Sequence, residues 1–305
     1  MHGFNRLVVS ILPHIPEKLV WIFSKRYIAG KYLEDAIRVS QSFNEEGIRV
    51  TLDLLGEFQS ERKKIAYYKE QYIKTIDAVI EKKINATFSL KPTMFGLLID
   101  TELCFETVRE IVERAASASY FVRIDMEDSQ CTDLEIELFR YLKKEFPGYV
   151  GIVLQSCMRR TLEDLKNMND LNSQEYPLNI RLCKGIYNEP EEIAFKDKQE
   201  INDNYLIDLE YMLQQGYYPA IATHDKTLVT GAYKLLEKYN IQPDSYEFQM
   251  LYGVTPRLRN RIVSEGNAMR VYVPYGKDWF NYSTRRLQEN PKMAFHIIKA
   301  LFIRK

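Results

Sequence analysis

Polar side chains that could do chemistry recur where short apolar runs of this 305-residue chain end. The positions are Lys91, Asp125, Gln155, Arg181, Lys184, Thr223, His224 and Tyr272. Any one of them alone is more often a cap or an ion-pair partner than a catalyst. Together they supply cations, a carboxylate, an amide and an imidazole. A fold that brings them to one mouth would suit an anionic substrate and a polar cofactor.

A second candidate is the segment YVPYGKDWFNYSTRRLQENP, residues 272–291. If it forms a helix, one side carries Tyr282, Arg285, Arg286 and Glu289, which are three or four positions apart. Two guanidinium groups beside an aromatic ring can bind a small carboxylate in a bidentate manner. The alternative is an exposed helix with ion pairs worth about 0.3–0.5 kcal/mol each. Taken by itself, the segment favours this alternative.

The elements that must position these residues follow from periodicity. Eight apolar runs rich in Val, Ile, Leu, Phe and Tyr predict buried strands at 48–55, 86–92, 121–126, 150–156, 178–184, 219–224, 246–252 and 269–274. Charged segments with helical apolar spacing lie between them, for example at 61–83, 132–145 and 226–240. The repeat of roughly thirty residues is the size of a βαβ unit.

Eight such units predict an α/β fold, a (β/α)8 TIM-type barrel whose chemistry lies at the carboxyl ends of the strands. The alternative is an open doubly wound sheet, which more often carries G-x-G-x-x-G after its first strand, and that motif is absent. We expect one domain over 1–305. It would comprise an N-terminal helical arm at 1–45, the barrel at 46–290 and a C-terminal helix at 291–305.

Composition excludes several classes of protein. Lys plus Arg and Asp plus Glu number 42 each, so there is no general footprint for nucleic acid. Four separated cysteines are not a disulfide framework, and four scattered histidines show no zinc spacing, so no metal is expected. No window supplies the ~20 mostly apolar residues of a membrane span. These features predict a cytoplasmic protein.

Several short motifs carry a resemblance to a known family. They are DLLGE (53–57), SLKPT (89–93), VRIDMED (122–128), LQS (154–156), RLCKGIY (181–187), ATHD (222–225), EFQMLYG (247–253) and YVPYG…Y..RR..E (272–289). In this order, and over nearly the full length, the chain resembles flavin-dependent proline dehydrogenase. The resemblance implies a distorted barrel whose last helix lies over the mouth. It also implies the single-domain, monofunctional bacterial form, because there is no room for an attached aldehyde dehydrogenase domain.

The resemblance also implies roles for individual residues. Those that would bind substrate are Lys91, Arg285 and Arg286 at the proline carboxylate, and Tyr272, Tyr282 and Leu182 around the ring. Asp125 and Arg181 would be the catalytic pair, with Arg181 near flavin N5. The FAD contacts would be Met126, Gln155, Lys184, Gly185, Ile186, Thr223 and His224. Three positions depart from the family pattern, namely Cys183, Ile186 and Asp225.

The implied reaction is oxidation of L-proline to Δ1-pyrroline-5-carboxylate, the first step of proline catabolism. A hydride would pass from C5 to flavin N5, and the electrons would pass to a membrane quinone. Membrane contact would be peripheral, at the inner face of the cell membrane. Members that prefer hydroxyproline lack the tyrosine present here at 272, so L-proline is the expected substrate. Two alternatives stay open: a barrel flavoenzyme of the methylenetetrahydrofolate reductase type, and a carboxylate-binding barrel without catalysis.

Overall fold

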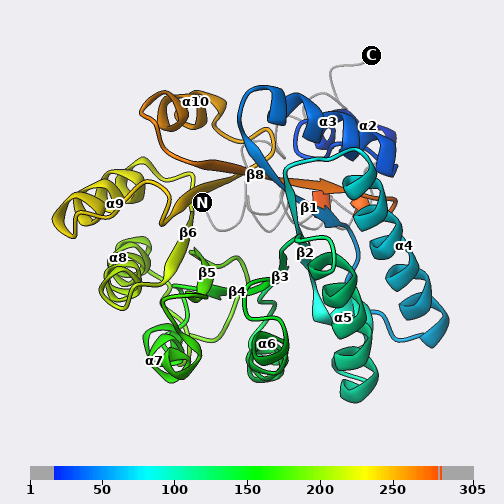
Figure 1. The fold of residues 1–305 in the computed structure, drawn as a ribbon, viewed down its shortest axis with the longest axis horizontal. Helices are drawn as coiled ribbons and strands as arrows, with labels where there is room; N and C mark the ends of the chain where they lie inside the picture. The colour runs from blue at the N-terminus through cyan, green and yellow to red at the C-terminus, as the bar shows by residue number, and fades with distance from the viewer. Residues whose placement is uncertain (1–16, 281, 284–305) are drawn as a thin grey trace, which may run out of the picture.

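The computed structural model describes residues 17–280, 282 and 283, and its centre is a closed barrel of parallel strands (Figure 1). The strands are β1 (Arg49–Leu54), β2 (Ala86–Leu90), β3 (Val122–Ile124), β4 (Val150–Gln155), β5 (Asn179–Cys183), β6 (Tyr218–Ala222), β7 (Glu247–Leu251) and β8 (Met269–Tyr275). Each strand pairs with its neighbour in chain order, and β8 pairs with β1. The barrel is therefore confirmed, and the doubly wound sheet is excluded. Each expected apolar run overlaps a strand, although β6 begins one residue before its run and β8 ends one residue after its run.

Helices surround the barrel, as Figure 1 shows. They are α4 (Arg62–Glu81), α5 (Thr101–Ala116), α6 (Thr132–Glu145), α7 (Thr161–Asn167), α8 (Lys198–Gln214), α9 (Lys226–Lys238) and α10 (Pro256–Ser264), with the 3-10 helices η2 (Pro92–Phe95) and η3 (Asn169–Leu171). In α5 the buried residues Cys104, Val108, Ile111 and Val112 recur at helical spacing. Such a stripe buries one side of a helix against the sheet. The helices expected within 61–83, 132–145 and 226–240 are confirmed.

The two faces of each strand carry different side chains, because neighbouring residues point to opposite sides. In β7, Phe248 and Met250 belong to the apolar core. Glu247 and Gln249 instead make hydrogen bonds inside the barrel. Branched apolar residues usually fill a barrel of this type. In this protein the interior of the barrel carries polar and charged side chains, so residues within the strands contribute functional groups to the site.

Two helices of the N-terminal arm, drawn in blue in Figure 1, precede the barrel, and the second of them lies beside β1 and β8. Trp21 packs edge-on against Trp279, with ring centroids 4.8 Å apart. A Cβ on Gly253, which has φ +73°, would lie 1.7 Å from the Arg26 carbonyl oxygen, so only glycine allows the arm this close. The two helices are α2 (Glu17–Ser24) and α3 (Leu33–Glu45).

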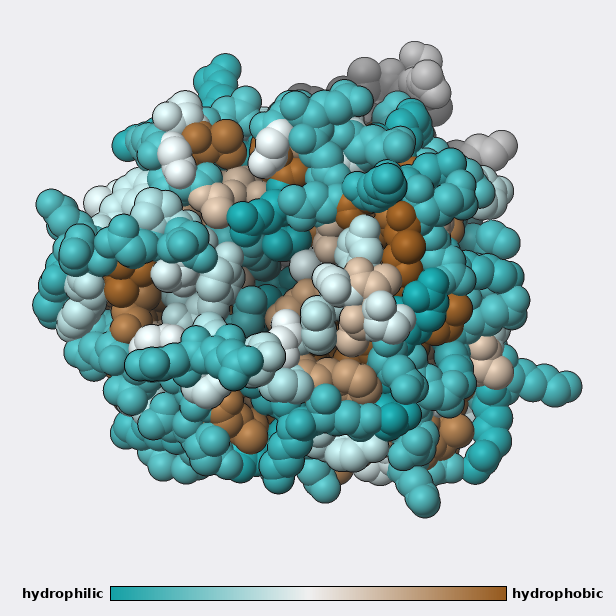
Figure 2. All heavy atoms as spheres, in the orientation of Figure 1, coloured by the Kyte–Doolittle hydropathy of each residue, from teal (hydrophilic) through white to brown (hydrophobic). Residues whose placement is uncertain are grey.

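The segment after β8 turns into a helix, with residues 279, 280, 282 and 283 helical. Arg285, Arg286 and the helix expected at 291–305 lie outside the described residues. Within the described part of the chain, no helix combines the length and apolarity needed to cross a bilayer. The face drawn in Figure 2 is mainly hydrophilic, and its apolar residues form small, separate groups.

Candidate active site

A cavity of about 1040 Å³ lies at the carboxyl ends of the strands. Most of the expected site residues line it: Lys91, Asp125, Met126, Gln155, Arg181, Lys184, Gly185, Ile186, Thr223, His224, Tyr272 and Tyr282. Pockets for small ligands span about 300–1,000 Å³. This cavity is therefore large enough for a cofactor together with a small substrate.

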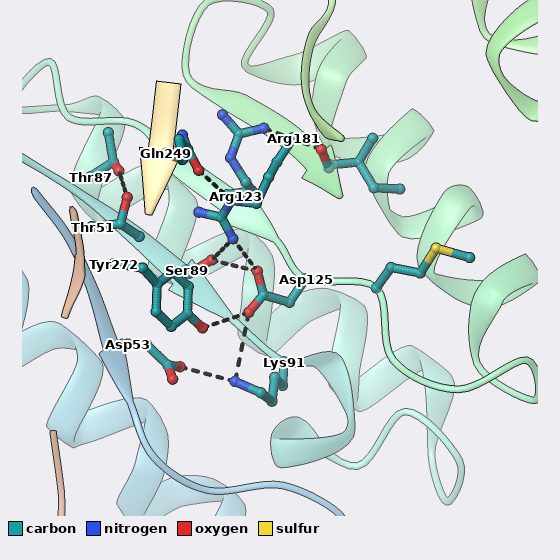
Figure 3. A network of polar contacts seen from close by, with 12 residues as sticks. Thr51, Asp53, Thr87, Ser89, Lys91, Arg123, Asp125, Arg181, Gln249 and Tyr272 are labelled. Atoms are coloured by element: carbon teal, nitrogen blue, oxygen red, sulfur yellow. Dashed lines mark hydrogen bonds and ion pairs between the residues drawn. The ribbon is translucent and has the colours of Figure 1, made fainter. Parts of the chain in front are cut away.

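Asp125 is the centre of the polar network in the cavity (Figure 3). Its carboxylate accepts hydrogen bonds from Ser89 Oγ at 2.5 Å, Arg181 Nη1 at 2.9 Å and Tyr272 Oη at 2.9 Å. Lys91 Nζ lies 3.6 Å away. Burial alone would raise the pKa of Asp125, but the charges of Arg181 and Lys91 hold it below its usual value. The carboxylate is therefore ionised at neutral pH and can only accept.

Lys91 joins this network to a second buried carboxylate. Its Nζ lies 3.1 Å from Asp53 Oδ1, and the Asp53 side chain is fully buried. Burial raises the pKa of Asp53 although Lys91 opposes the shift. Burial alone would lower the pKa of Lys91, but Asp53 and Asp125 raise it well above its usual value. The ammonium group thus keeps its charge at the cavity wall.

Arg181 and Tyr272 hold one another in place. The Arg181 guanidinium lies 5.0 Å from the centroid of the Tyr272 ring, a cation–π contact. Arg181 also donates through Nη1 to Ser89 Oγ at 3.0 Å and through Nε to Gln249 Oε1 at 2.6 Å. Its Nη2 is buried and has no partner among the protein atoms. A ligand in the cavity is the natural acceptor for that group.

Gln155 and Gly185 form a close-fitting part of the wall. Gln155 Nε2 donates to the carbonyl oxygens of Met126 and Glu127, at 3.2 and 2.8 Å. Its Oε1 is buried without a partner. Gly185 has φ +98°, and a Cβ there would lie 2.7 Å from Gln155 Oε1 and 2.3 Å from Cys157 Sγ. Only glycine fits, and a buried acceptor remains for a ligand.

Charged groups gather at the outer part of the cavity. Asp225 begins α9, where its side chain accepts a backbone N–H as an N-cap. Lys184 Nζ lies 2.7 Å from Asp225 Oδ2, and Lys198 Nζ lies 3.4 Å from the same oxygen. His224 Nε2 accepts the Leu251 N–H at 2.9 Å. Asp225 therefore holds Lys184 in addition to starting a helix.

Some cavity residues were not expected from the sequence. They are Val153, Tyr187, Lys198, Ala222, Lys226, Gln249, Met250 and Leu251. Cys183 and Asp225, two of the departures from the family pattern, also line the cavity. Asp53 and Ser89 support the site from beneath. The sequence held one signal that could have indicated Gln249. Polar residues at alternate positions of an apolar run, such as Glu247 and Gln249, lie on the same side of a strand.

Three of the expected substrate-binding residues are not among the described residues that line the cavity. Leu182 is fully buried and does not line the cavity, although its neighbours Arg181 and Cys183 do. Its carbonyl oxygen accepts the Tyr205 hydroxyl at 3.0 Å. The role of Leu182 beside the substrate ring stays a prediction. The same holds for Arg285 and Arg286, which lie outside the described residues.

Glu127 gives a prediction for the pH dependence of stability. Its carboxylate is buried beneath the site and accepts the Thr93 N–H at 3.0 Å and Thr93 Oγ1 at 2.6 Å. Burial raises its pKa from 4.5 to about 7. An acid that binds its proton more tightly in the folded state makes the free energy of unfolding fall as pH rises through this window.

Urea unfolding tests this assignment. Between pH 4.5 and 7 the free energy of unfolding should fall less in Glu127→Gln than in the wild type. The exposed control Glu70→Gln should keep the wild-type slope, and an unchanged slope in Glu127→Gln would contradict the assignment.

Comparison with known proteins agrees with this geometry. The family model described as proline dehydrogenase matches residues 36–296. Proline dehydrogenase 1 of Bacillus subtilis (strain 168) is 35% identical over 278 residues, which cover 91% of this chain and 90% of that protein. Proline dehydrogenase of Deinococcus radiodurans is 35% identical over 302 residues, covering 97% and 96%.

A solved structure is similar in fold. It is the crystal structure of proline utilization A (PutA) from Bdellovibrio bacteriovorus inactivated by N-propargylglycine. The TM-score is 0.85 at 25% sequence identity, and the match covers 94% of this chain. It spans only 36% of that much longer chain. Among the described residues there is no group of three or more His, Cys, Asp or Glu side chains that could hold a metal ion.

Proposed function

The chain belongs to the proline dehydrogenase family, and from this premise we propose that its cavity binds FAD and L-proline together. The enzyme is an oxidoreductase of the first step of proline catabolism. The product would be Δ1-pyrroline-5-carboxylate. The observation that carries the proposal is the cluster of Lys91, Asp125, Arg181 and Tyr272 at one end of a cavity too large for proline alone.

The cavity residues fit FAD. Gln155 Oε1 and Arg181 Nη2 are a buried acceptor and a buried donor without protein partners. Gly185 leaves the wall open where any side chain would collide with Gln155. Lys184 and Lys198 add positive charge, which suits a phosphate-bearing ligand. When bound, FAD would supply the oxidation by accepting a hydride at N5, because cofactors carry such chemistry while the protein orients the reactants.

The protein's own groups would bind and orient the substrate. Lys91, with Arg285 and Arg286, would hold the proline carboxylate. Fixing the carboxylate sets the position of C5, and correct placement accounts for much of the rate enhancement of enzymes. Arg181 would bind the flavin through Nη2 and stabilise the negative charge that gathers there. Asp125 would keep Arg181 and Tyr272 in position through its two carboxylate oxygens.

The electrons would leave to a membrane quinone. This part of the proposal comes from the family resemblance and requires peripheral contact with the bilayer. The identity of the electron acceptor can be tested by steady-state assays with a soluble quinone analogue and, separately, with an oxidised nicotinamide cofactor. Turnover with the nicotinamide cofactor but not with the quinone analogue would contradict the proposed quinone acceptor.

One experiment separates the three candidate functions. The purified protein should be yellow, release FAD on denaturation, and lose its flavin absorbance when L-proline is added without oxygen. A reductase of the methylenetetrahydrofolate type would be yellow but bleached by a nicotinamide donor instead. A barrel that only binds carboxylates would be colourless. A colourless protein that binds no FAD at micromolar concentration would overturn the proposal.

Tyr272 predicts substrate preference. Its hydroxyl is bound by Asp125 and its ring lies against Arg181, so it cannot swing aside to admit a ring hydroxyl. We expect kcat/KM for L-proline to exceed that for trans-4-hydroxy-L-proline by at least about tenfold, the effect of one poorly accommodated group. Tyr272→Ser should narrow this ratio. Equal values for the two substrates in the wild type would contradict the prediction and direct attention to Ile186.

A further inference from the structure

Arg181 is held by a chain of buried hydrogen bonds that continues into the barrel interior, and Figure 3 shows its first step at Gln249. Arg181 Nε donates to Gln249 Oε1 at 2.6 Å, and Gln249 Nε2 donates to Glu247 Oε1 at 2.6 Å. Gln249 and Glu247 are 4% and 2% exposed. They are two positions apart in β7, so both face the interior.

The Glu247 carboxylate decides which way the Gln249 amide faces. Arg270 donates to both Glu247 oxygens, at 2.7 and 3.0 Å. Burial alone would raise the pKa of Glu247, but the charge and hydrogen bonds of Arg270 lower it to about 2. An ionised carboxylate accepts hydrogen bonds and donates none. Gln249 must therefore turn its NH2 group toward Glu247 and its oxygen toward Arg181.

The orientation of Gln249 in turn fixes the direction of Arg181. The guanidinium group is planar and rigid, so contacts on two of its edges determine where the third edge points. Gln249 occupies the Nε edge, and Asp125 together with Ser89 occupies Nη1. The third group, Nη2, is the buried donor without a protein partner. Arg181 lines the cavity, and Nη2 is its one nitrogen without a protein partner among the described residues.

We propose that Gln249, oriented by Glu247, is a positioning residue that aims Arg181 Nη2 at the cofactor. This inference rests on the proposed function, in which Arg181 binds the flavin. Gln249 itself lines the cavity, so direct contact with a ligand is the competing explanation. The two explanations differ in whether the effect of Gln249 passes through Arg181.

A double-mutant cycle distinguishes them, because residues that act through one another give non-additive effects. The variants are Gln249→Met, Arg181→Met and the pair, each checked for FAD content. The readouts are the limiting rate of anaerobic flavin reduction by proline and the midpoint potential of the bound flavin. Arg181→Met should lower the rate about a hundredfold, and Gln249→Met about tenfold. Both should shift the potential to more negative values, and the pair should behave like Arg181→Met alone.

The outcomes separate this inference from the proposed function. If Gln249→Met lowers the rate equally with and without Arg181, Gln249 acts directly and the inference is overturned while Arg181 keeps its role. An unchanged rate and potential in Gln249→Met overturns it too. If Arg181→Met changes neither readout, the proposed role of Arg181 fails, and the inference fails with it.

Gln249→Glu serves as a second variant of the same length. The charge of Glu247 disfavours ionisation of the new carboxyl, whereas the charges of Arg181 and Arg270 favour it, so the carboxyl would be protonated only at low pH. The protonated form can still donate to Glu247 and accept from Arg181, so the rate should be near the wild-type value. The ratio of its rate to that of the wild type should fall as pH rises. A ratio that stays constant, with only stability reduced, would mark a purely structural role and overturn the inference.

Thr51→Val is the matched control. It removes a part-buried hydrogen bond between β1 and β2 in the same barrel, which joins Thr51 Oγ1 and Thr87 Oγ1 at 2.8 Å. Neither threonine lines the cavity, and the hydrogen bonds of Arg181 go to Gln249, Ser89 and Asp125 instead. The control should leave the rate and the flavin potential unchanged, so any general effect of weakening the barrel would be seen there.

Discussion

Asp125→Asn should lower kcat for proline by roughly a hundredfold, the scale measured when a preorganised electrostatic contact is removed from an active site. The amide keeps the size of the side chain but no longer balances the charges of Arg181 and Lys91. The NH2 group of the new side chain would also face hydrogen-bond donors, from which the carboxylate accepts in the wild type. Steady-state kinetics on FAD-loaded protein give the measurement.

The control for this change is Ser89→Ala. It removes one donor to Asp125 and one acceptor of Arg181 Nη1, but leaves the ion pair between Asp125 and Arg181 intact. Its effect on kcat should be much smaller than that of Asp125→Asn. If Asp125→Asn turns over proline at the wild-type rate while it retains FAD, Asp125 has no part in catalysis.

Lys91→Met should raise the KM for proline about ten- to a hundredfold. A hydrogen bond to a charged group contributes about 1.5–3 kcal/mol, and 1.4 kcal/mol is a factor of ten. The change should also lower the free energy of unfolding by up to about 3–5 kcal/mol, because it leaves Asp53 buried without its cation. Kinetics and urea unfolding together test both effects.

The double variant Lys91→Met with Asp53→Asn separates binding from stability. Neutralising Asp53 removes the uncompensated buried charge, so much of the lost stability should return. The proline KM should stay high, because no cation has been restored. A KM that recovers with stability would show that Lys91 supports the fold and does not bind the carboxylate.

The architecture could be predicted because local patterns determine it. Each strand is a short apolar run, and each helix has an apolar stripe that ends at a charged or turn-forming segment. The helix expected at 132–145 is α6, Thr132–Glu145. Such patterns hold wherever burial on one side is the main requirement.

The contacts within the site could not be predicted in the same way. Lys91 and Asp53 are 38 positions apart, and they meet because the register of β1 against β2 sets Asp53 beside Ser89. Glu247 and Gln249 are hidden within an expected apolar strand. Their partners Arg270 and Arg181 become evident only once the barrel closes. The sequence predicts which side chains are polar, and strand register decides which of them pair.

The contact between the arm and the segment after β8 was also beyond prediction. Nothing in the spacing of Trp21 and Trp279 indicates that their rings touch. Gly253 is the last residue of the family motif at 247–253, and the structural reason for a glycine there is the close approach of Arg26 from the arm. Contacts of this kind depend on the path of the chain between elements, which has no local periodicity.

The polar interior of the barrel also limits what the protein can hold. Among the described residues, the buried or nearly buried charges on the inner side of the strands, with Lys91 directly after β2, are four cations against three carboxylates: Lys91, Arg123, Arg181 and Arg270 against Asp53, Asp125 and Glu247. The fourth cation, Arg123, donates to backbone oxygens of Ile152 and Asn179 and to the Asn179 side chain, and has no carboxylate of its own. In a medium of low dielectric, such an imbalance is far more costly than at the surface. The interior of the barrel therefore carries a net positive charge. This charge favours the binding of a ligand that carries or acquires negative charge over a cation of the same size.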